Sequence, residues 1–142
     1  PSAQPRKRAQ RMASRERPLS PHLQVYRWQI QMVGSILHRA TGIVLAVGAL
    51  IIAGGLLALM MGPASWSCFT EHAGAWYGKV YLFGWSWAFS YHLCNGIRHM
   101  SEDFALGVSI PAFVRNSWMA VIGCLVITAL IWTYVLMNGG AA

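Results

Sequence analysis

Three long stretches without a charged residue organise this chain. Residues 43–62, 80–97 and 117–137 contain no Asp, Glu, Lys or Arg, and the first two extend back towards Gly34 and Trp76. A helix needs about 20 apolar residues to cross the hydrocarbon core of a bilayer, and a lone span must satisfy its own backbone hydrogen bonds. The pattern therefore predicts an all-α membrane protein with three transmembrane helices, at about 34–62, 76–103 and 115–138.

The composition fits this class. The chain has 142 residues, of which 56% are hydrophobic and 11% are charged, whereas a soluble domain averages about 25% charged residues. The length is enough for one domain. A soluble bundle of buried helices is the alternative architecture.

Basic residues gather at one end of the predicted bundle. Eight of the eleven Lys and Arg residues precede the first charge-free stretch. Arg98 and Arg115 lie in the second connection, on the same side, and Lys79 lies in the first connection, on the opposite side. The positive-inside rule then places the N-terminus on the cytoplasmic side of a bacterial membrane, or on the matrix side of the mitochondrial inner membrane. The basic arm at 1–16 suits anionic lipid or an acidic partner, and its composition also fits the remnant of a mitochondrial targeting segment.

The connections carry weaker signals. Two prolines favour an extended juxtamembrane segment within 17–33, and 63–79 is expected to be a loop. Glu71 and His72 in that loop are a weak metal signal, and a solvated surface is the better interpretation. Pro111 is expected to break the chain before the third helix. Three cysteines do not make a disulfide framework, and without a CxxCH motif no covalent haem attachment is expected.

The densest cluster of polar residues lies at 91–103, with the sequence YHLCNGIRHMSED. His92 and His99 are seven residues apart, so they share one face of a helix. Gly96 lies between them, and Gly84 and Ala88 continue the same stripe of small residues. Such a stripe leaves room for a large planar ligand or a closely packed helix. Because an ionisable group at membrane depth indicates function, we interpret His92 as a haem iron ligand.

A second polar patch begins the first predicted helix, at 35–42 with the sequence SILHRATG. Antiparallel helices would bring Ser35, His38 and Arg39 to about the depth of His92 and His99. In the alternative interpretation Arg39 reaches lipid phosphate and His38 caps the membrane interface.

Asp103 is four residues beyond His99, within reach to fix the tautomer of that imidazole. It could instead pair with Arg98 or Arg115.

Together, three segments resemble one family, the cytochrome b large membrane-anchor subunit of succinate dehydrogenase (succinate:ubiquinone oxidoreductase, respiratory complex II). The segments are RPLSPHLQVY at 17–26, SILHRATG at 35–42 and HLCNGIRHMSED at 92–103. Their order and spacing extend the resemblance over roughly 17–137.

The resemblance implies a role for each patch. His92 matches an axial ligand of haem b, whose second axial histidine comes from a small partner anchor subunit that completes the helix bundle. His38, Arg39 and His99 match the haem propionate environment, whereas Ser35 and Arg39 match the ubiquinone site. Asp103 matches a supporting polar residue nearby.

The implied function is that of an electron-transfer and anchoring subunit of an oxidoreductase complex. Its partners would be the small anchor subunit, a flavoprotein subunit, an iron–sulfur subunit that meets segment 17–33, and membrane lipid, with no nucleic acid. A haem-less structural anchor of the same complex is the nearest alternative.

Two other functions are less compatible with the sequence. In a cytochrome with both haem ligands internal, His92 would pair with His99, which is on the same helix, or with His38, which is expected to lie too close to the membrane edge. A transporter subunit is disfavoured because the three spans show no internal repeat.

Overall fold

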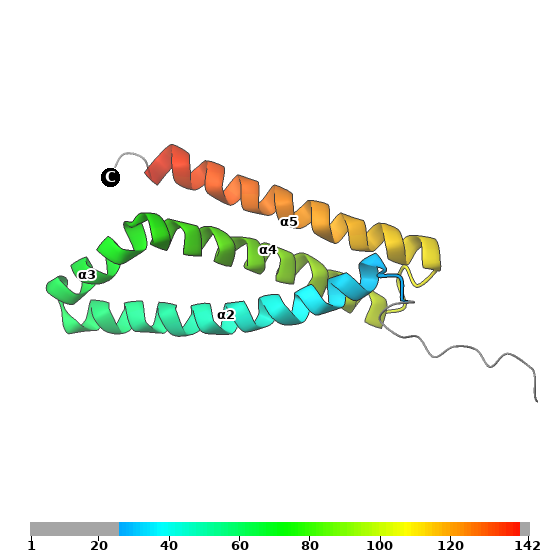
Figure 1. Cartoon of the computed structure of the whole chain (residues 1–142), viewed down its shortest axis with the longest axis horizontal. Helices are drawn as coiled ribbons and strands as arrows, with labels where there is room; N and C mark the ends of the chain where they lie inside the picture. Colours follow the sequence, from blue (N-terminus) through cyan, green and yellow to red (C-terminus); the bar gives the residue numbers. More distant parts are fainter. Residues whose placement is uncertain (1–25, 140–142) are drawn as a thin grey trace, which may run out of the picture.

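The structure, a computed structural model, describes residues 26–139 of the chain. Within this range every regular element is a helix (Figure 1): α2 at Ile30–Met61, α3 at Pro63–Gly74, α4 at Trp76–Asp103 and α5 at Ile110–Gly139. The basic arm expected at 1–16 and most of the juxtamembrane segment expected at 17–33 lie outside the described residues.

Helix α4 is the centre of the molecule, because it packs against both α2 and α5. Each long helix runs antiparallel to the long helix before it, and the short α3 joins the far end of α2 to the start of α4 (Figure 1). The start of α2, the end of α4 and the start of α5 therefore meet at one end of the molecule, which we call the α4–α5 turn end.

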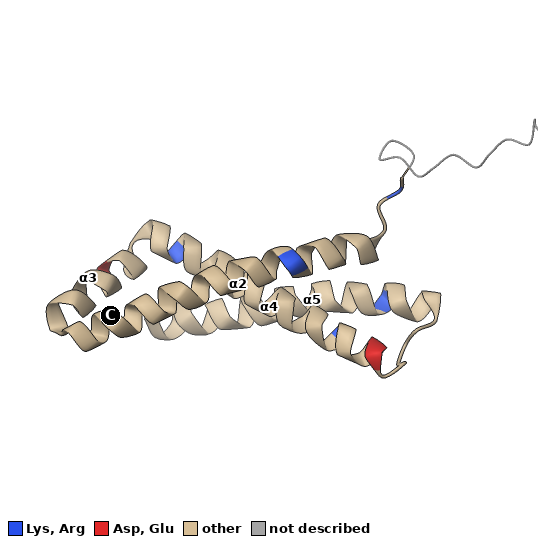
Figure 2. Cartoon of the chain, turned by 90° about the horizontal axis from the view of Figure 1, so that it is seen from below, with Lys and Arg blue, Asp and Glu red and all other residues tan. Residues whose placement is uncertain are grey.

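Two helices, α2 and α5, are long and apolar enough to cross a membrane by length and composition. The sequence predicted three such helices, and α4 does not meet this criterion. The reason is its polar second half, where Ser90, His92, Asn95 and Arg98 replace the apolar residues of its neighbours. Figure 2 shows how sparse charge is along all three long helices.

The expectation of a loop over 63–79 is wrong, because Pro63–Gly74 forms helix α3 and residues 76–79 begin α4, so that Ala75 alone lies between the two helices. Pro63 occupies the first helical position, where its missing N–H costs no hydrogen bond. Gly62 allows the sharp break between α2 and α3, because its φ of 114° is unfavourable for other residues. Pro111 likewise lies in the first turn of α5, so it starts that helix rather than preceding it.

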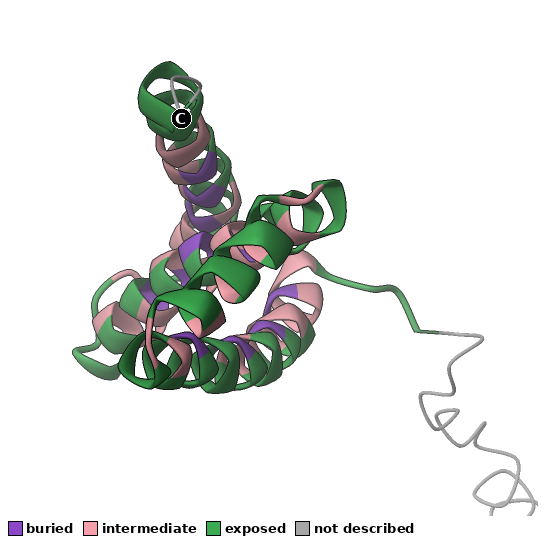
Figure 3. Cartoon of the chain, turned by 90° about the vertical axis from the view of Figure 1, so that its left-hand side faces the viewer, coloured by how far each residue is buried: buried purple, intermediate pink, exposed green. Residues whose placement is uncertain are grey.

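Small and polar side chains fill the contacts between helices. Ala88, Ser90, Ala120 and Cys124 are all buried, and small residues let helix backbones approach closely. Buried positions face the interior of the molecule and exposed positions face outward (Figure 3). The outer surface is rich in large apolar side chains such as Leu50, which is 74% exposed, as expected of a surface that meets lipid or a partner subunit.

Candidate functional site

Three histidines from two helices form one cluster. The rings of His38 on α2 and His92 on α4 are stacked, with centroids 3.9 Å apart and planes 10° apart. The ring of His99 lies 5.4 Å from that of His38, tilted by 56°. The expected convergence of the two polar patches is therefore confirmed for His38.

The same stacking corrects one inference from the sequence, that His38 lies too close to the membrane edge to meet His92. The two rings are in contact, so the depth estimate was wrong. They still cannot share one metal between them, because a bound metal lies in the plane of each imidazole, about 2 Å from its nitrogen, and these planes are stacked. A pair of ligands formed by His38 and His92 is thus excluded by ring orientation.

The surroundings of His92 indicate which of its two ring nitrogens is available to bind a metal. Its Nδ1 lies 3.2 Å from the backbone oxygen of His38 and 3.3 Å from Oγ1 of Thr41. A carbonyl oxygen only accepts hydrogen bonds, so this contact favours the tautomer with a proton on Nδ1, in which the neutral ring has its lone pair on Nε2. This is the arrangement usual for a metal-binding histidine, whose other ring nitrogen donates to a carbonyl or carboxylate.

Glycines let the imidazoles lie flat against the opposite helix. A Cβ added at Gly42 would lie 3.2 Å from Cε1 of His92, and one at Gly96 would lie 3.8 Å from Cε1 of His38. Beside the cluster is a cavity of about 380 Å³ between α2 and α4, and Gly84 and Ala88 from the predicted small-residue stripe line it.

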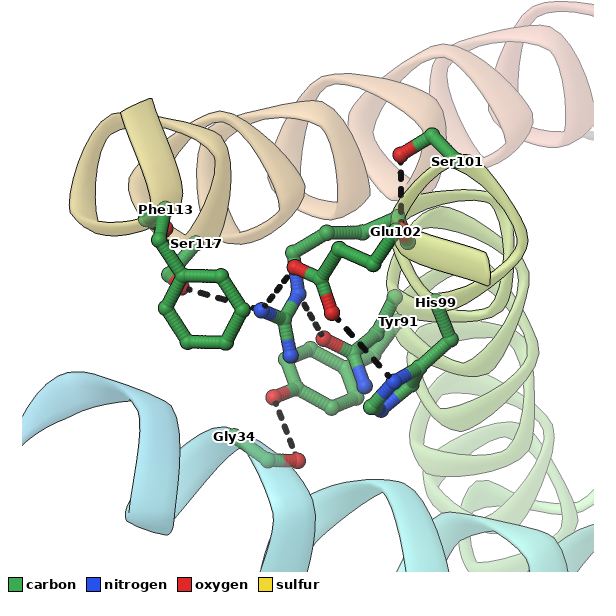
Figure 4. A network of polar contacts seen from close by, with 9 residues as sticks. Gly34, Tyr91, His99, Ser101, Glu102, Phe113 and Ser117 are labelled. Carbon is green, nitrogen blue, oxygen red and sulfur yellow. Dashed lines mark hydrogen bonds and ion pairs between the residues drawn. The ribbon is translucent and has the colours of Figure 1, made fainter. Parts of the chain in front are cut away.

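Arg98 forms a second polar centre, which ties α4 to α5 (Figure 4). Its side chain is 4% exposed. Its Nε donates to Oδ1 of Asn95 at 3.0 Å, and its Nη1 donates to Oε1 of Glu102 at 2.8 Å and to Oγ of Ser117 at 3.4 Å. Its guanidinium also lies 5.0 Å from the ring centre of Phe113. A buried charge is tolerated when it is paired and hydrogen-bonded in this way.

The carboxylate beside His99 is that of Glu102, whose Oε2 lies 3.7 Å from His99 Nδ1. Asp103, which the sequence analysis considered for this role, is exposed and makes no ion pair within residues 26–139. It therefore forms no ion pair with His99 or with the two arginines considered as its partners. The separations of three and four residues that join Glu102 to His99 and Arg98 are ordinary helix spacings, so the sequence contained this signal.

The two site residues predicted on α2 besides His38 are less enclosed. Ser35 is half-buried and Arg39 is exposed, and neither side chain makes a hydrogen bond within the described part of the chain. A further tie between the helices comes from Tyr91, whose hydroxyl donates to the backbone oxygen of Gly34 at 3.2 Å (Figure 4). Thr41 and Tyr91 both lie in segments singled out from the sequence, but neither was assigned a role there.

Comparison with known proteins gives consistent matches. Residues 13–132 match the family described as succinate dehydrogenase/fumarate reductase transmembrane subunit. The chain is 37% identical over 114 residues to the succinate dehydrogenase cytochrome b556 subunit of Paracoccus denitrificans, covering 80% of this chain and 88% of that protein. It is 38% identical over 117 residues to the corresponding Rickettsia felis subunit, covering 82% and 91% of the two chains. It is also 36% identical over 111 residues to the mitochondrial cytochrome b560 subunit of Sus scrofa, covering 75% and 64%.

Proposed function

The chain belongs to the succinate dehydrogenase/fumarate reductase transmembrane subunit family, and from this premise we propose that it carries haem b on His92 and helps to form the site of ubiquinone reduction. Family membership makes it a membrane-anchor subunit of a respiratory complex. The haem, the quinone site and the individual partners are the proposal.

Helix α4 is proposed to be the third membrane span. Its 28 residues give a length of about 42 Å at 1.5 Å per residue, which is longer than a bilayer core of about 30 Å. Two of its most polar residues, Asn95 and Arg98, are buried within the molecule, so they do not face lipid. The excess of basic residues favours an N-terminus on the cytoplasmic or matrix side, in a bacterial cytoplasmic membrane or the mitochondrial inner membrane.

The contact between His92 Nδ1 and the His38 carbonyl oxygen is the observation that carries the haem proposal. This contact favours the tautomer in which Nε2 can bind iron, so the donor chemistry fits the cofactor. When bound, a haem with two imidazole ligands has no open coordination position and supplies electron transfer without oxygen binding. The family resemblance implies that the second ligand comes from the small partner anchor subunit, and the stacking of His38 on His92 is consistent with a ligand from outside this chain.

The other two histidines of the cluster, His38 and His99, together with Arg39, suit the haem propionate groups. Anionic propionates in a medium of low dielectric constant need cationic or hydrogen-bond-donor partners. Arg39 is an exposed cation one residue after His38, and Nδ1 of His38 is buried with no hydrogen-bond partner among the described residues. His99 completes this environment from α4.

Ubiquinone reduction needs groups that stabilise negative charge. Charge builds on the quinone carbonyl oxygens before protons arrive, and a preorganised donor and cation lower the free energy of that charged state. The Ser35 hydroxyl and the Arg39 guanidinium provide such a pair on α2. Asp103, exposed at the α4–α5 turn end, supports this region from the aqueous side on which protons enter.

The partners follow from the same proposal. A flavoprotein subunit oxidises succinate, and an iron–sulfur subunit carries electrons towards the membrane and contacts segment 17–33. The apolar outer surface meets lipid and the small anchor subunit. This chain alone is therefore one part of the catalyst.

The experiment compares His92→Ala with the matched variant His72→Ala, because His72 is exposed on α3, at the other end of the molecule. His92→Ala is expected to lose haem from the purified complex while succinate oxidation with a soluble dye acceptor is retained, and His72→Ala is expected to keep both. A His92→Ala complex with full haem content and an unchanged spectrum would refute the ligand assignment.

A further inference from the structure

We propose that Glu102 is a positioning residue for His99, and that Arg98 holds the Glu102 carboxylate in place. This inference rests on the proposed function, because His99 matters here as part of the haem and quinone environment. It assigns a specific task to a carboxylate that the sequence did not single out.

The first step concerns how Glu102 is fixed. Arg98 is almost fully buried, with 4% of its side chain exposed, and Glu102 retains 14% exposure. The 2.8 Å bond between Nη1 and Oε1 is a charge-assisted hydrogen bond, the shorter and stronger kind. Asn95 and Ser117 hold the guanidinium from two further directions. Glu102 is therefore anchored through one of its oxygens.

The second step concerns the oxygen that remains. Oε2 of Glu102 lies 3.7 Å from Nδ1 of His99, and Figure 4 shows the carboxylate between the guanidinium and this imidazole. A carboxylate at Nδ1 favours a proton on that nitrogen and directs Nε2 away from it. The ring of His99, whose side chain is 43% exposed, lies 5.4 Å from the His38 ring, and at this ion-pair distance the carboxylate favours that orientation over others.

The third step compares the two adjacent carboxylates. Asp103 is exposed and has no ion pair within the described range, whereas Glu102 faces both Arg98 and His99. Both are acidic and both lie near the end of α4, so net charge alone cannot distinguish them. Only Glu102 has the contacts that allow it to act through His99.

The experiment measures the haem midpoint potential and the quinone kinetics of the assembled complex carrying Glu102→Gln. The amide can still accept a hydrogen bond from Arg98, so the complex is expected to assemble with full haem content. A negative charge near the haem stabilises its oxidised form, so removing that charge is expected to raise the midpoint potential. The KM for ubiquinone is expected to increase about 2- to 5-fold, the range of a partly exposed ion pair, without a change in succinate oxidation by a dye.

A double-mutant cycle separates positioning from a general effect of charge. If Glu102 acts through His99, adding Glu102→Gln to a His99→Gln complex is expected to raise the KM for ubiquinone no further, whereas the shift in midpoint potential, a direct effect of charge, is expected to persist. Glu71→Gln, which removes a carboxylate at the opposite end of the molecule, is the matched control and is expected to behave as wild type. Glu102→Asp is expected to restore part of the wild-type behaviour.

Three results would overturn the inference: a wild-type KM for ubiquinone in Glu102→Gln, an undiminished increase of that KM in the His99→Gln background, or a larger increase from Asp103→Asn than from Glu102→Gln. Each of these differs from failure of the proposed function, in which the wild-type complex itself would lack haem or quinone reductase activity.

Discussion

The contact between Gly48 of α2 and Trp85 of α4 offers a quantitative test of how these two helices pack. A Cβ added at Gly48 would overlap the Trp85 indole, whereas one added at Gly54, six residues further along the same helix, would meet nothing within 4 Å. Both Gly→Ala changes gain the same helix propensity, about 1 kcal/mol. The difference between the two variants therefore isolates the steric clash.

Overpacking of this kind costs about 1–3 kcal/mol, so Gly48→Ala is expected to be less stable than Gly54→Ala by that amount. The assay is an SDS unfolding titration of the purified protein in mixed micelles, followed by tryptophan fluorescence. Gly54→Ala is expected to be as stable as wild type or more so. Equal stability of the two variants would show that Trp85 does not lie over Gly48, and would contradict the packing of α2 on α4.

Three further predictions concern other contacts. Arg98→Met leaves the Glu102 carboxylate without its counter-charge and is expected to lower the free energy of unfolding by about 3 kcal/mol in the same titration. The exposed control Arg115→Met is expected to stay within about 0.5 kcal/mol of wild type. Equal effects of the two variants would contradict the buried ion pair. Trp132→Phe removes the 2.8 Å hydrogen bond from its Nε1 to Ser86 Oγ and is expected to cost about 1 kcal/mol, and no loss would show that this bond does not stabilise the α4–α5 contact. Arg39→Ala is expected to lower quinone reduction about tenfold or more while succinate-to-dye activity is kept, whereas equal losses in both assays would indicate an assembly defect.

Much of the helical layout was predictable, because a helix that crosses a bilayer must be about 20 residues long and nearly free of charge. The second helix was expected at 76–103 and α4 has the same bounds, Trp76–Asp103. The first and third begin a few residues before their expected starts, at Ile30 and Ile110. The added residues, IQMV at 30–33 and IPAFV at 110–114, are mostly apolar, so the helices start before the points from which the charge-free stretches were extended.

Helix α3 could not be found from hydrophobic periodicity. Its sequence, PASWSCFTEHAG, has no buried residue within the described structure, and although Phe69 packs against Gly55 of α2, the helix lacks the repeated apolar positions that would mark it as helical. Its start was visible only as Pro63 after Gly62, a pattern that also fits a turn.

The sequence predicted that the two polar patches meet, but it did not predict which side chains contact each other within the site. Antiparallel geometry brought His38 near His92, whereas the ring stacking also depends on the small residue Gly42 opposite His92 and could not be read from spacing. The choice between Glu102 and Asp103 depended on helix rotation. A helix turns about 100° per residue, so adjacent carboxylates face different surroundings.

The most direct test of the central claim is a reduced-minus-oxidised visible spectrum of the complex purified through this chain, with its co-purifying subunits identified. The account predicts the sharp signal of a six-coordinate haem b, together with a flavoprotein, an iron–sulfur protein and a small anchor subunit. Those partners without haem would leave a structural anchor and contradict the role of His92. Haem without those partners would contradict the proposed assembly.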